Sequence, residues 1–385
     1  MKQREIFTTT PRLVMGPGSL TTITDEIARL GASSVLVITD PGLKATGIVT
    51  RLEDILRQGG IATNLFDQVE ADPPFELADA ALARLRAAGA QAVIGIGGGS
   101  SLDIAKVVSV MATNEIPVTN MFGIDLIQKP GLPLILIPTT AGTGSEVTPI
   151  VILSDHHEKL KKGIVSPYLY PSCALLDPEL TIGLPPKVTA ATGMDALIHA
   201  VEAYTSRNVT AMSDILATEA IRIIYGNIRT AFSDGENITA RSNMLRGSML
   251  AGMAFANAGV TAVHAFAYPI GAEFHIPHGI ANTIMLVPVM QFNMIGNLER
   301  FAAIAGMFGR PTAGLSTRQA AQVAIDALSE LSDDLRVPRH LGEFGVKDKD
   351  VPELAAGVMK VTRLLANNPR KLQLADAEAI YRAVL

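Results

Sequence analysis

The sequence predicts an α/β N-terminal half built on a parallel, doubly wound sheet, followed by an all-helical C-terminal half. Short apolar runs alternate with helical segments in the first 140 residues, a pattern that favours a parallel sheet with helices on both faces. From about Leu184 onward, long segments rich in alanine, isoleucine and methionine replace the strand-like runs. Two consecutive prolines follow Leu184, so we predict one domain at residues 1–184 and a second at 185–385.

The individual elements follow from hydrophobic periodicity and turn residues. Apolar runs rich in β-branched residues predict strands at 34–40, 61–69, 91–100 and 131–140. Helical spacing predicts helices at 52–60, 76–90 and 101–114, the first two closed by glycine. The second half is expected to be helical over 187–230, 240–258 and 314–332.

Composition excludes several classes of protein. The chain has 385 residues, of which 48% are hydrophobic, and this excludes a disordered protein. Its 32 basic and 37 acidic residues give a net charge of −5, so neither nucleic acid nor an anionic membrane is an expected partner. The single cysteine, Cys173, excludes an internal disulfide and is interpreted as a buried apolar residue. The first residues lack the apolar run of a signal peptide, so none is expected, and no run reaches the roughly 18 apolar residues of a membrane span. We therefore expect a soluble, cytoplasmic protein.

A glycine-rich loop joins the third predicted strand to the helix after it. Gly97, Gly98 and Gly99 precede Ser100, and the free N–H groups at the start of a helix suit a pyrophosphate. The spacing matches neither a complete G-x-G-x-x-G fingerprint nor a Walker A loop. A plain strand-to-helix turn, capped by Ser100 or Ser101, is therefore the competing interpretation.

Two more polar segments follow predicted strands. Asp40 ends the first strand, where its carboxylate could accept hydrogen bonds from an adenosine ribose, although a cap before Pro41 is the simpler role. A hydroxyl-rich loop with Thr139, Thr140 and Thr143 follows the fourth strand. Because ligands of open α/β sheets bind beyond the carboxyl ends of the strands, these loops together favour a dinucleotide-binding crevice.

One aspartate and several histidines form a candidate metal site. Asp195 and His199 are four residues apart in an apolar helical segment, so they share one helix face. By themselves they could form a buried hydrogen bond, but His264, His275 and His278 lie in a second segment that has few charges. The aspartate with three of the histidines supplies four nitrogen and oxygen ligands and no thiolate. Such a set suits Fe²⁺, Zn²⁺ or another first-row dication.

The sequence resembles the iron-containing, or group III, alcohol dehydrogenases along nearly the whole chain. The resemblance rests on several motifs in the family's order: MGPGSL near residue 15, GGGSSLD, PTTAGTGSEVT, GMDALIHAVEAYTS, HAFAYPIGAEFHIPHG and NNPR at 367–370. It implies a dehydroquinate synthase-like fold, with an N-terminal dinucleotide-binding domain and a C-terminal helical, metal-binding domain.

The resemblance also implies roles for single residues. The metal ligands fall on Asp195, His199, His264 and His278. The dinucleotide contacts fall on Gly97, Gly98, Gly99, Ser100, Thr139, Thr140, Thr143 and Lys161, and Lys162 adjoins the last of these. Asp40 falls at the position that selects NAD over NADP. Many members carry a histidine four residues after the third ligand, where this chain has Tyr268. The proton relay is therefore open between Tyr268, His275 and water.

The activity implied by the resemblance is an NAD(H)-dependent oxidoreduction between a small alcohol and its aldehyde or ketone. A divalent metal, Fe²⁺ or else Zn²⁺ or another dication, would polarise the substrate oxygen for hydride transfer. Phe255, Phe266 and Ile276, with no lysine or arginine at 255–280, predict a small uncharged substrate. A metal- and NAD-dependent lyase of the dehydroquinate synthase type and a catalytically silent nucleotide-binding protein are the alternatives. Members of the family are typically oligomers, so we expect a homodimer or a larger homo-oligomer.

Overall fold

The computed structural model describes residues 4–156 and 160–385. These residues form two compact units. Residues 9–183 make up one unit, and residues 184–385 make up the other together with the segment before residue 9. That residues 1–184 and 185–385 fold as independent domains stays a prediction.

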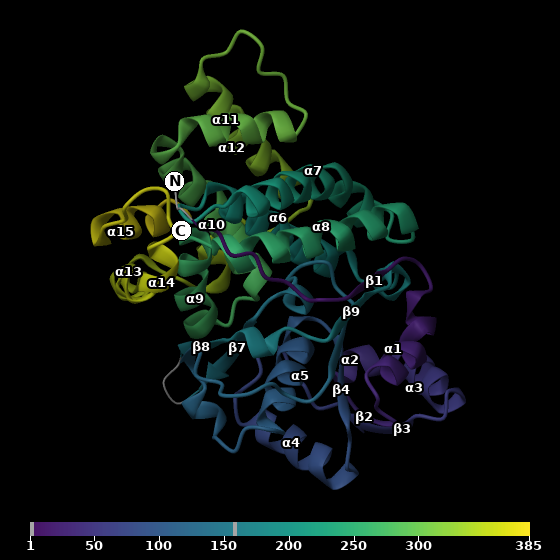
Figure 1. Ribbon diagram of the computed structural model, residues 1–385. Coiled ribbons are helices and arrows are strands. Elements are labelled where there is room, and N and C mark those ends of the chain that lie inside the picture. Colours follow the sequence, from purple (N-terminus) through teal and green to yellow (C-terminus); the bar gives the residue numbers. More distant parts are fainter. Residues whose placement is uncertain (1–3, 157–159) are drawn as a thin grey trace. The chain divides into compact units, whose positions relative to one another are not determined.

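The unit at residues 9–183 is built on a six-stranded sheet in which every pair of neighbours is parallel (Figure 1). Its strands, in the order of the chain, are β1 (Leu13–Met15), β2 (Ser34–Ile38), β3 (Ala62–Phe66), β4 (Ala92–Gly97), β6 (Leu134–Pro138) and β9 (Cys173–Leu176). The strands predicted from the sequence are confirmed as β2, β3, β4 and β6, whereas β1 and β9 were not predicted. Cys173 is fully buried in β9, as expected.

Helices cover both faces of this sheet. They are α1 (Ile23–Arg29), α2 (Pro41–Ala45), α3 (Ile48–Gln58), α4 (Leu77–Ala88) and α5 (Gly99–Met111). Alternate residues of each strand face opposite sides, so Val35 and Val37 pack with α1 and α3, whereas Leu36 and Ile38 pack with α4 and α5. The two hydrophobic cores on either side of the sheet confirm the doubly wound α/β architecture.

The order of the strands identifies a switch point. The strands lie in the order β1-β9-β6-β4-β2-β3. From β2 the chain moves outward to β3, and it then returns to place β4 on the other side of β2. Open α/β sheets bind ligands beyond the carboxyl ends of the strands at such a reversal. The residues that follow β2 and β4, which include Asp40 and Gly97–Gly99, occupy this position.

A second, smaller sheet in the same unit was not predicted. It contains β5 (Gly123–Ile124), β7 (Ile150–Asp155) and β8 (Leu160–Val165), in the order β5-β8-β7. β7 pairs with β8 in antiparallel register, and β5 pairs with β8 in parallel register. The polar run between β7 and β8 concealed the hairpin, because it resembles a solvated loop more than a strand boundary.

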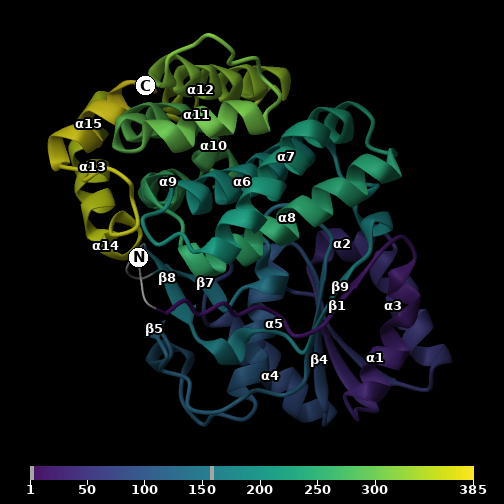
Figure 2. The same cartoon turned by 45° about the horizontal axis from the view of Figure 1, so that its top comes forward.

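The unit that begins at residue 184 is helical. Its helices are α6 (Pro186–Thr205), α7 (Ala211–Ser233), α8 (Ile238–Ala258), α9 (Ala262–Phe274), α10 (His278–Asn293), α11 (Leu298–Met307), α12 (Thr317–Asp334), α13 (Val351–Lys360), α14 (Thr362–Leu365) and α15 (Leu374–Arg382). Residues 184–385, all of which the structure describes, contain no strand. Figure 2 shows α6, α7 and α8 lying side by side.

One predicted helix is divided in two. The periodicity over 187–230 continues across residues 206–210, where α6 ends and α7 begins. The break arises because Thr210 caps the new helix: its hydroxyl accepts a hydrogen bond from the Ser213 N–H, and the Ser213 hydroxyl accepts one from the Thr210 N–H. Such a capping box satisfies two N–H groups that would otherwise lack partners.

Within the described residues, one helical stretch is long and apolar enough to cross a membrane. It is His278–Gly296, of 19 residues, and 56% of it is buried inside the protein. The core helix of a globular protein has the same length and composition, so this stretch is weak evidence for a membrane span.

Candidate functional site

Three of the predicted metal ligands converge in the helical unit. Asp195 and His199 stand one turn apart on α6, and His264 lies in the first turn of α9. One ligand atom from each can be chosen so that all three lie within 4.8 Å of one another. The His264 Nε2 is 3.7 Å from the Asp195 Oδ1. All three side chains are buried, so a buried carboxylate meets two imidazoles at one point.

His278 borders this group from the start of α10. Its Nε2 lies 3.8 Å from the Asp195 Oδ1, and its side chain is 31% exposed. One turn later on α10, the buried Asn282 donates a hydrogen bond from its Nδ2 to the Asp195 Oδ1, at 2.8 Å. The same Nδ2 is 3.1 Å from the His278 Nε2. His278 is therefore the most accessible of the four predicted ligands, and Asn282 holds its position relative to Asp195.

The charges in this group stabilise one another. Burial opposes ionisation of Asp195, but His199, His278 and His264 outweigh it and lower the pKa of this carboxyl. Burial likewise disfavours a charged His264, but Glu202 and Asp195 raise its pKa above the ordinary value. Glu202, on α6, was not singled out from the sequence. Its carboxylate lies 2.5 Å from the His264 Nδ1.

The donor set fits a divalent cation. The His264 Nε2 is buried and has no hydrogen-bond partner among the described residues, although buried polar atoms are nearly always paired. Its neighbours are a carboxylate and two further imidazoles, and no thiolate is among them. This combination binds Fe²⁺, Zn²⁺ and similar dications.

The two candidate proton relays differ in their surroundings. Tyr268 lies one turn after His264 on α9, and its ring centre is 6.3 Å from that of His278. His275 ends α9 in a left-handed conformation, with φ +53°, and its side chain is exposed. The structure therefore brings Tyr268 beside a predicted metal ligand and leaves His275 at the surface.

Three apolar residues were expected near the substrate. Of these, Phe255 contacts a predicted metal ligand directly. Its ring stacks on the His199 ring, with the ring centres 4.3 Å apart. Phe266 instead packs against Tyr381 in the core, with 4.9 Å between ring centres, and is fully buried. Ile276 is also buried. The apolar environment of the histidines thus comes from Phe255 on α8.

The glycines and threonines predicted to contact the dinucleotide lie at the carboxyl ends of adjacent strands in the α/β unit. β4 and β6 run side by side, with Gly97 opposite Pro138. The Thr139 N–H donates a hydrogen bond to the Gly97 carbonyl, at 3.0 Å. The glycine loop and the threonine loop are therefore joined directly.

The glycines allow a close approach between the two loops. A Cβ added at Gly99 would lie 2.7 Å from the Thr143 Cγ2, whereas one added at Gly98 would meet nothing nearer than 3.8 Å. Gly98 is the N-cap of α5, and no side chain caps this helix. The cap by Ser100 or Ser101 that belonged to the competing interpretation is therefore not formed: α5 begins at Gly99, which places both serines inside its first turn. The first N–H groups of α5 are left without a side-chain cap.

Asp40 has the capping role that the sequence suggested for its position, and its other carboxylate oxygen lies beside the glycine loop. Its Oδ1 accepts a hydrogen bond from the Leu43 N–H at 2.8 Å and so caps α2. Its Oδ2 lies close to the glycine loop, 3.3 Å from where a Cβ on Gly97 would be. This carboxylate is oriented by its hydrogen bond to α2 and lies beside the glycine loop. It is suitably placed to contact a ribose.

Lys161 lies in the smaller sheet. On β8 its Nζ forms an ion pair with Asp72, at 2.6 Å, and its side chain is 8% exposed. The neighbouring Lys162 pairs with Asp155 at 2.8 Å. The structure thus gives each of the two lysines an acidic partner, and a role for either in nucleotide binding stays a prediction.

A buried charged cluster under the threonine loop was missed in the sequence analysis. Asp103 accepts hydrogen bonds from the Ser145 hydroxyl at 2.6 Å and from the Ile152 N–H at 2.9 Å, which ties α5 to the end of the loop and to β7. Lys106 is fully buried, and burial lowers its pKa to about 8. Burial raises the pKa of Glu146 to about 7. Charged residues three apart in an otherwise apolar helix, as Asp103 and Lys106 are, were the signal that could have revealed this cluster.

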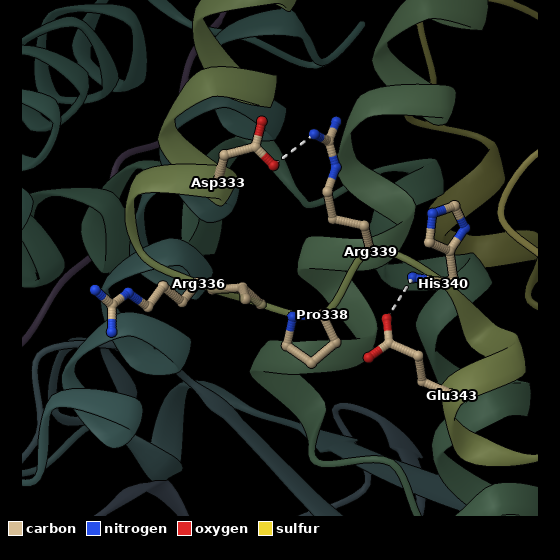
Figure 3. Close-up of a pocket in the computed structure, with 7 residues that line it drawn as sticks. Asp333, Arg336, Pro338, Arg339, His340 and Glu343 are labelled. Atoms are coloured by element: carbon tan, nitrogen blue, oxygen red, sulfur yellow. Dashed lines mark hydrogen bonds and ion pairs between the residues drawn. The ribbon is translucent and has the colours of Figure 1, made fainter.

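A surface hollow of about 420 Å³ lies elsewhere in the helical unit (Figure 3). Asp333, Arg339, His340 and Glu343 border it, and Arg339 is paired with Asp333 at 2.6 Å. Its lining includes none of the predicted metal or nucleotide residues, so it is not part of the candidate site.

Comparison with known proteins identifies the family. The family model described as iron-containing alcohol dehydrogenase matches residues 10–178, and the C-terminal model of the same family matches residues 189–385. The chain belongs to the iron-containing alcohol dehydrogenases.

Individual relatives agree with this assignment. Long-chain-alcohol dehydrogenase 1 of Geobacillus thermodenitrificans is 43% identical over 96% of this chain and 94% of its own. A crystal structure of 1,3-propanediol oxidoreductase superposes with a TM-score of 0.97 at 39% identity, covering all of both chains. A structure of sulfoacetaldehyde reductase from Bifidobacterium kashiwanohense in complex with NAD⁺ has a TM-score of 0.90 at 26% identity and covers 99% of both chains. The family and these relatives favour an oxidoreductase over the lyase and the silent protein considered from the sequence.

Proposed function

We propose that this protein interconverts a small alcohol and its aldehyde or ketone, with NAD(H) as the redox partner and a divalent cation at the substrate oxygen. Asp195, His199, His264 and His278 would hold the cation. The observation that carries the proposal is the buried Nε2 of His264, which has no hydrogen-bond partner among the described residues and lies 3.7 Å from the Asp195 carboxylate. Buried polar atoms are nearly always paired, and the atoms around this one are those that dications select.

The bound groups would supply what side chains cannot: the cation gives Lewis acidity at the substrate oxygen, and the nicotinamide accepts or donates the hydride. The protein fixes the donor atoms and limits water. Asp195 is held by Asn282, and His264 by Glu202. Phe255 stacks on His199 and shields that ring from solvent. Tyr268, beside His278, is our candidate to carry the proton of the alcohol, with His275 as the second candidate.

The dinucleotide would bind at the switch point of the parallel sheet. The uncapped N-terminus of α5, which follows Gly97 and Gly98, would receive the phosphates, with Ser100 in the first turn. Thr139, Thr140 and Thr143 border this loop. Lys161 is also proposed to contact the dinucleotide. Asp40 would accept hydrogen bonds from the adenosine ribose and repel a 2′-phosphate, which favours NAD over NADP. The NAD⁺ complex of the sulfoacetaldehyde reductase relative supports a nicotinamide cofactor.

We propose Fe²⁺ as the resident metal, on the basis of the family, with Zn²⁺ or another dication as a substitute that the same donors would accept. A small uncharged substrate agrees with the absence of Lys and Arg in 255–280 and with the phenyl ring on His199. A cytoplasmic location and a homodimer or larger homo-oligomer complete the proposal.

The test is metal replacement under anaerobic conditions. The purified protein is stripped with a chelator, reloaded separately with Fe²⁺ and Zn²⁺, and mixed with NADH and a panel of short aldehydes. We expect NADH oxidation that depends on the added metal and is abolished in Asp195→Ala, while this variant still binds NADH. Full activity in the stripped protein, or in Asp195→Ala, would refute the metal site.

A further inference from the structure

Glu202 is a fully buried carboxylate whose hydrogen bonds all reach the start of α9. It stands on α6, seven residues after Asp195 and three after His199, so the three side chains share one side of the helix. Its Oε1 accepts hydrogen bonds from the Val263 N–H at 2.7 Å and from the Thr261 hydroxyl at 2.5 Å. Its Oε2 is 2.5 Å from the His264 Nδ1.

The bond between Glu202 and His264 determines which nitrogen of His264 carries the proton. The carboxylate oxygens of Glu202 offer only acceptors, and its Oε1 already accepts from two donors, the Val263 N–H and the Thr261 hydroxyl. The Nδ1 of His264 must therefore be the donor. The lone pair of the neutral ring is then on Nε2, the atom that lies near Asp195 and has no hydrogen-bond partner among the described residues.

We propose that Glu202 is a positioning residue for the metal, acting through His264. It fixes the tautomer that presents a lone pair at Nε2, and it fixes the direction of the ring. This inference rests on the proposed function, because it assumes that His264 is a ligand. A carboxylate that accepts a hydrogen bond from a ligating histidine is a general device for orienting the ring and increasing its basicity.

Glu202 also supports the helix N-terminus, and this second role must be separated from the first. The Val263 N–H and the Thr261 hydroxyl are at the beginning of α9, where N–H groups lack intrahelical partners. A residue that served only as a cap would affect stability and not the protonation of His264. The substitution Glu202→Gln separates the two roles, because an amide oxygen can still accept from Val263 and Thr261. The amide NH₂ would then face the His264 Nδ1 and would require an acceptor there, which moves the ring proton to Nε2.

The control is Thr261→Val. It removes one hydrogen bond to Glu202 at the same helix terminus and leaves the bond between Glu202 and His264 in place. Both variants are measured as full-length protein, first for thermal unfolding of the stripped form and then for Zn²⁺ affinity by competition with a chromophoric chelator. We expect Glu202→Gln to weaken Zn²⁺ binding by about 10- to 100-fold, the usual effect of losing such a partner. We expect Thr261→Val to stay within about threefold of the wild type, because the residue lies outside the donor set.

Three results would overturn the proposal. Zn²⁺ affinity within about threefold of the wild type in Glu202→Gln would show that the carboxylate does not act on the metal. An equal loss in Thr261→Val would reduce Glu202 to a helix cap. Wild-type affinity no higher than that of Asp195→Ala would overturn the metal centre, and with it the proposed function, whereas the first two results leave that function standing.

A measurement on the wild-type protein does not depend on the folding of any variant. The chain has seven histidines, so the ¹⁵N resonances of their rings can be resolved in Zn²⁺-loaded protein. The proposal requires a protonated Nδ1 and a metal-bound Nε2 at His264. Zinc bound through Nδ1 would refute it.

Discussion

Replacing Gly98 with alanine is expected to separate nucleotide binding from stability. The backbone at Gly98 is extended, with φ −75° and ψ −179°, a conformation that alanine adopts without strain. The added Cβ would lie 3.8 Å from the Thr140 Cγ2, which is an ordinary van der Waals distance. Alanine is a poorer N-cap than glycine by roughly 1 kcal/mol, but it also reduces the entropy of the unfolded chain by about 0.4–1 kcal/mol. The two effects nearly cancel, so the unfolding temperature should change by no more than about 3 °C.

The binding of NADH should respond much more strongly. The methyl group would project from the N-cap position of α5 towards Thr140, and both are part of the proposed phosphate site. Loss of one hydrogen bond to a charged phosphate costs about 1.5–3 kcal/mol, which raises the Kd for NADH by about 10- to 100-fold. The assay is a titration of NADH fluorescence, together with thermal unfolding. Gly226→Ala is the matched control, because Gly226 lies on α7 with no heavy atom within 4 Å of an added Cβ. NADH affinity within about twofold of the wild type in Gly98→Ala would refute the assignment of the loop.

Three further substitutions test separate parts of the site. Asp40→Ser keeps a side-chain cap for α2 but removes the negative charge that would repel a 2′-phosphate. The ratio of kcat/KM for NADP to that for NAD should therefore rise at least about tenfold, the equivalent of 1.4 kcal/mol. An unchanged ratio would show that Asp40 does not select the cofactor. Tyr268→Phe should lower kcat by about 10²-fold, as expected for loss of a proton-transfer group, while His275→Ala, at the exposed end of α9, should retain most of the activity; the reverse result would assign the relay to His275. Burial raises the pKa of Glu146 to about 7 in the folded protein. Between the ordinary pKa of a glutamate and about pH 7, the folded state therefore retains a proton that the unfolded state has released. Wild-type stability consequently falls as the pH rises towards 7. Glu146→Gln should therefore gain in unfolding temperature relative to the wild type between pH 5 and pH 8, and a constant difference would contradict the buried, protonated carboxyl.

The sequence predicted those parts of the fold that are specified by local patterns. β2, β3, β4 and β6 are apolar runs that end in turn residues, and the periodicity of α3 and α4 ends at glycine. The three-residue β1 escaped prediction because its pairing partner, β9, is distant in the sequence. The hairpin of β7 and β8 escaped it because the polar run between the two strands resembles a solvated loop. The division between α6 and α7 was missed because the hydrophobic period continues through it, and only the capping box of Thr210 and Ser213 ends it.

Local sequence patterns predicted part of the candidate site but not the residues that act through distant contacts. Asp195 and His199 share a helix face, which spacing alone reveals. Three further histidines were singled out in a segment with few charges, and the resemblance to the family selected His264 and His278 among them. Glu202 and Asn282 were missed because their importance lies in contacts with residues 62 and 87 positions away. A glutamate that follows Asp195 by two helical turns in an apolar segment was the one local sign. Ser100 and Ser101 were expected as possible caps because they are good N-cap residues, but α5 begins too early for either to act as one.

The two candidate sites are held together by contacts within different parts of the chain. Asp195, His199, His264, His278, Glu202 and Asn282 all belong to the helical unit, whereas the glycine loop, the threonine loop and Asp40 all belong to the α/β unit. Among the described residues, the hydrogen bonds given above for each site join residues of its own unit. Removal of the metal should therefore leave the glycine loop intact, so a stripped protein that still binds NADH is the expected state. Loss of turnover in such a protein would report the absence of the cation from the chemistry rather than unfolding of the nucleotide site.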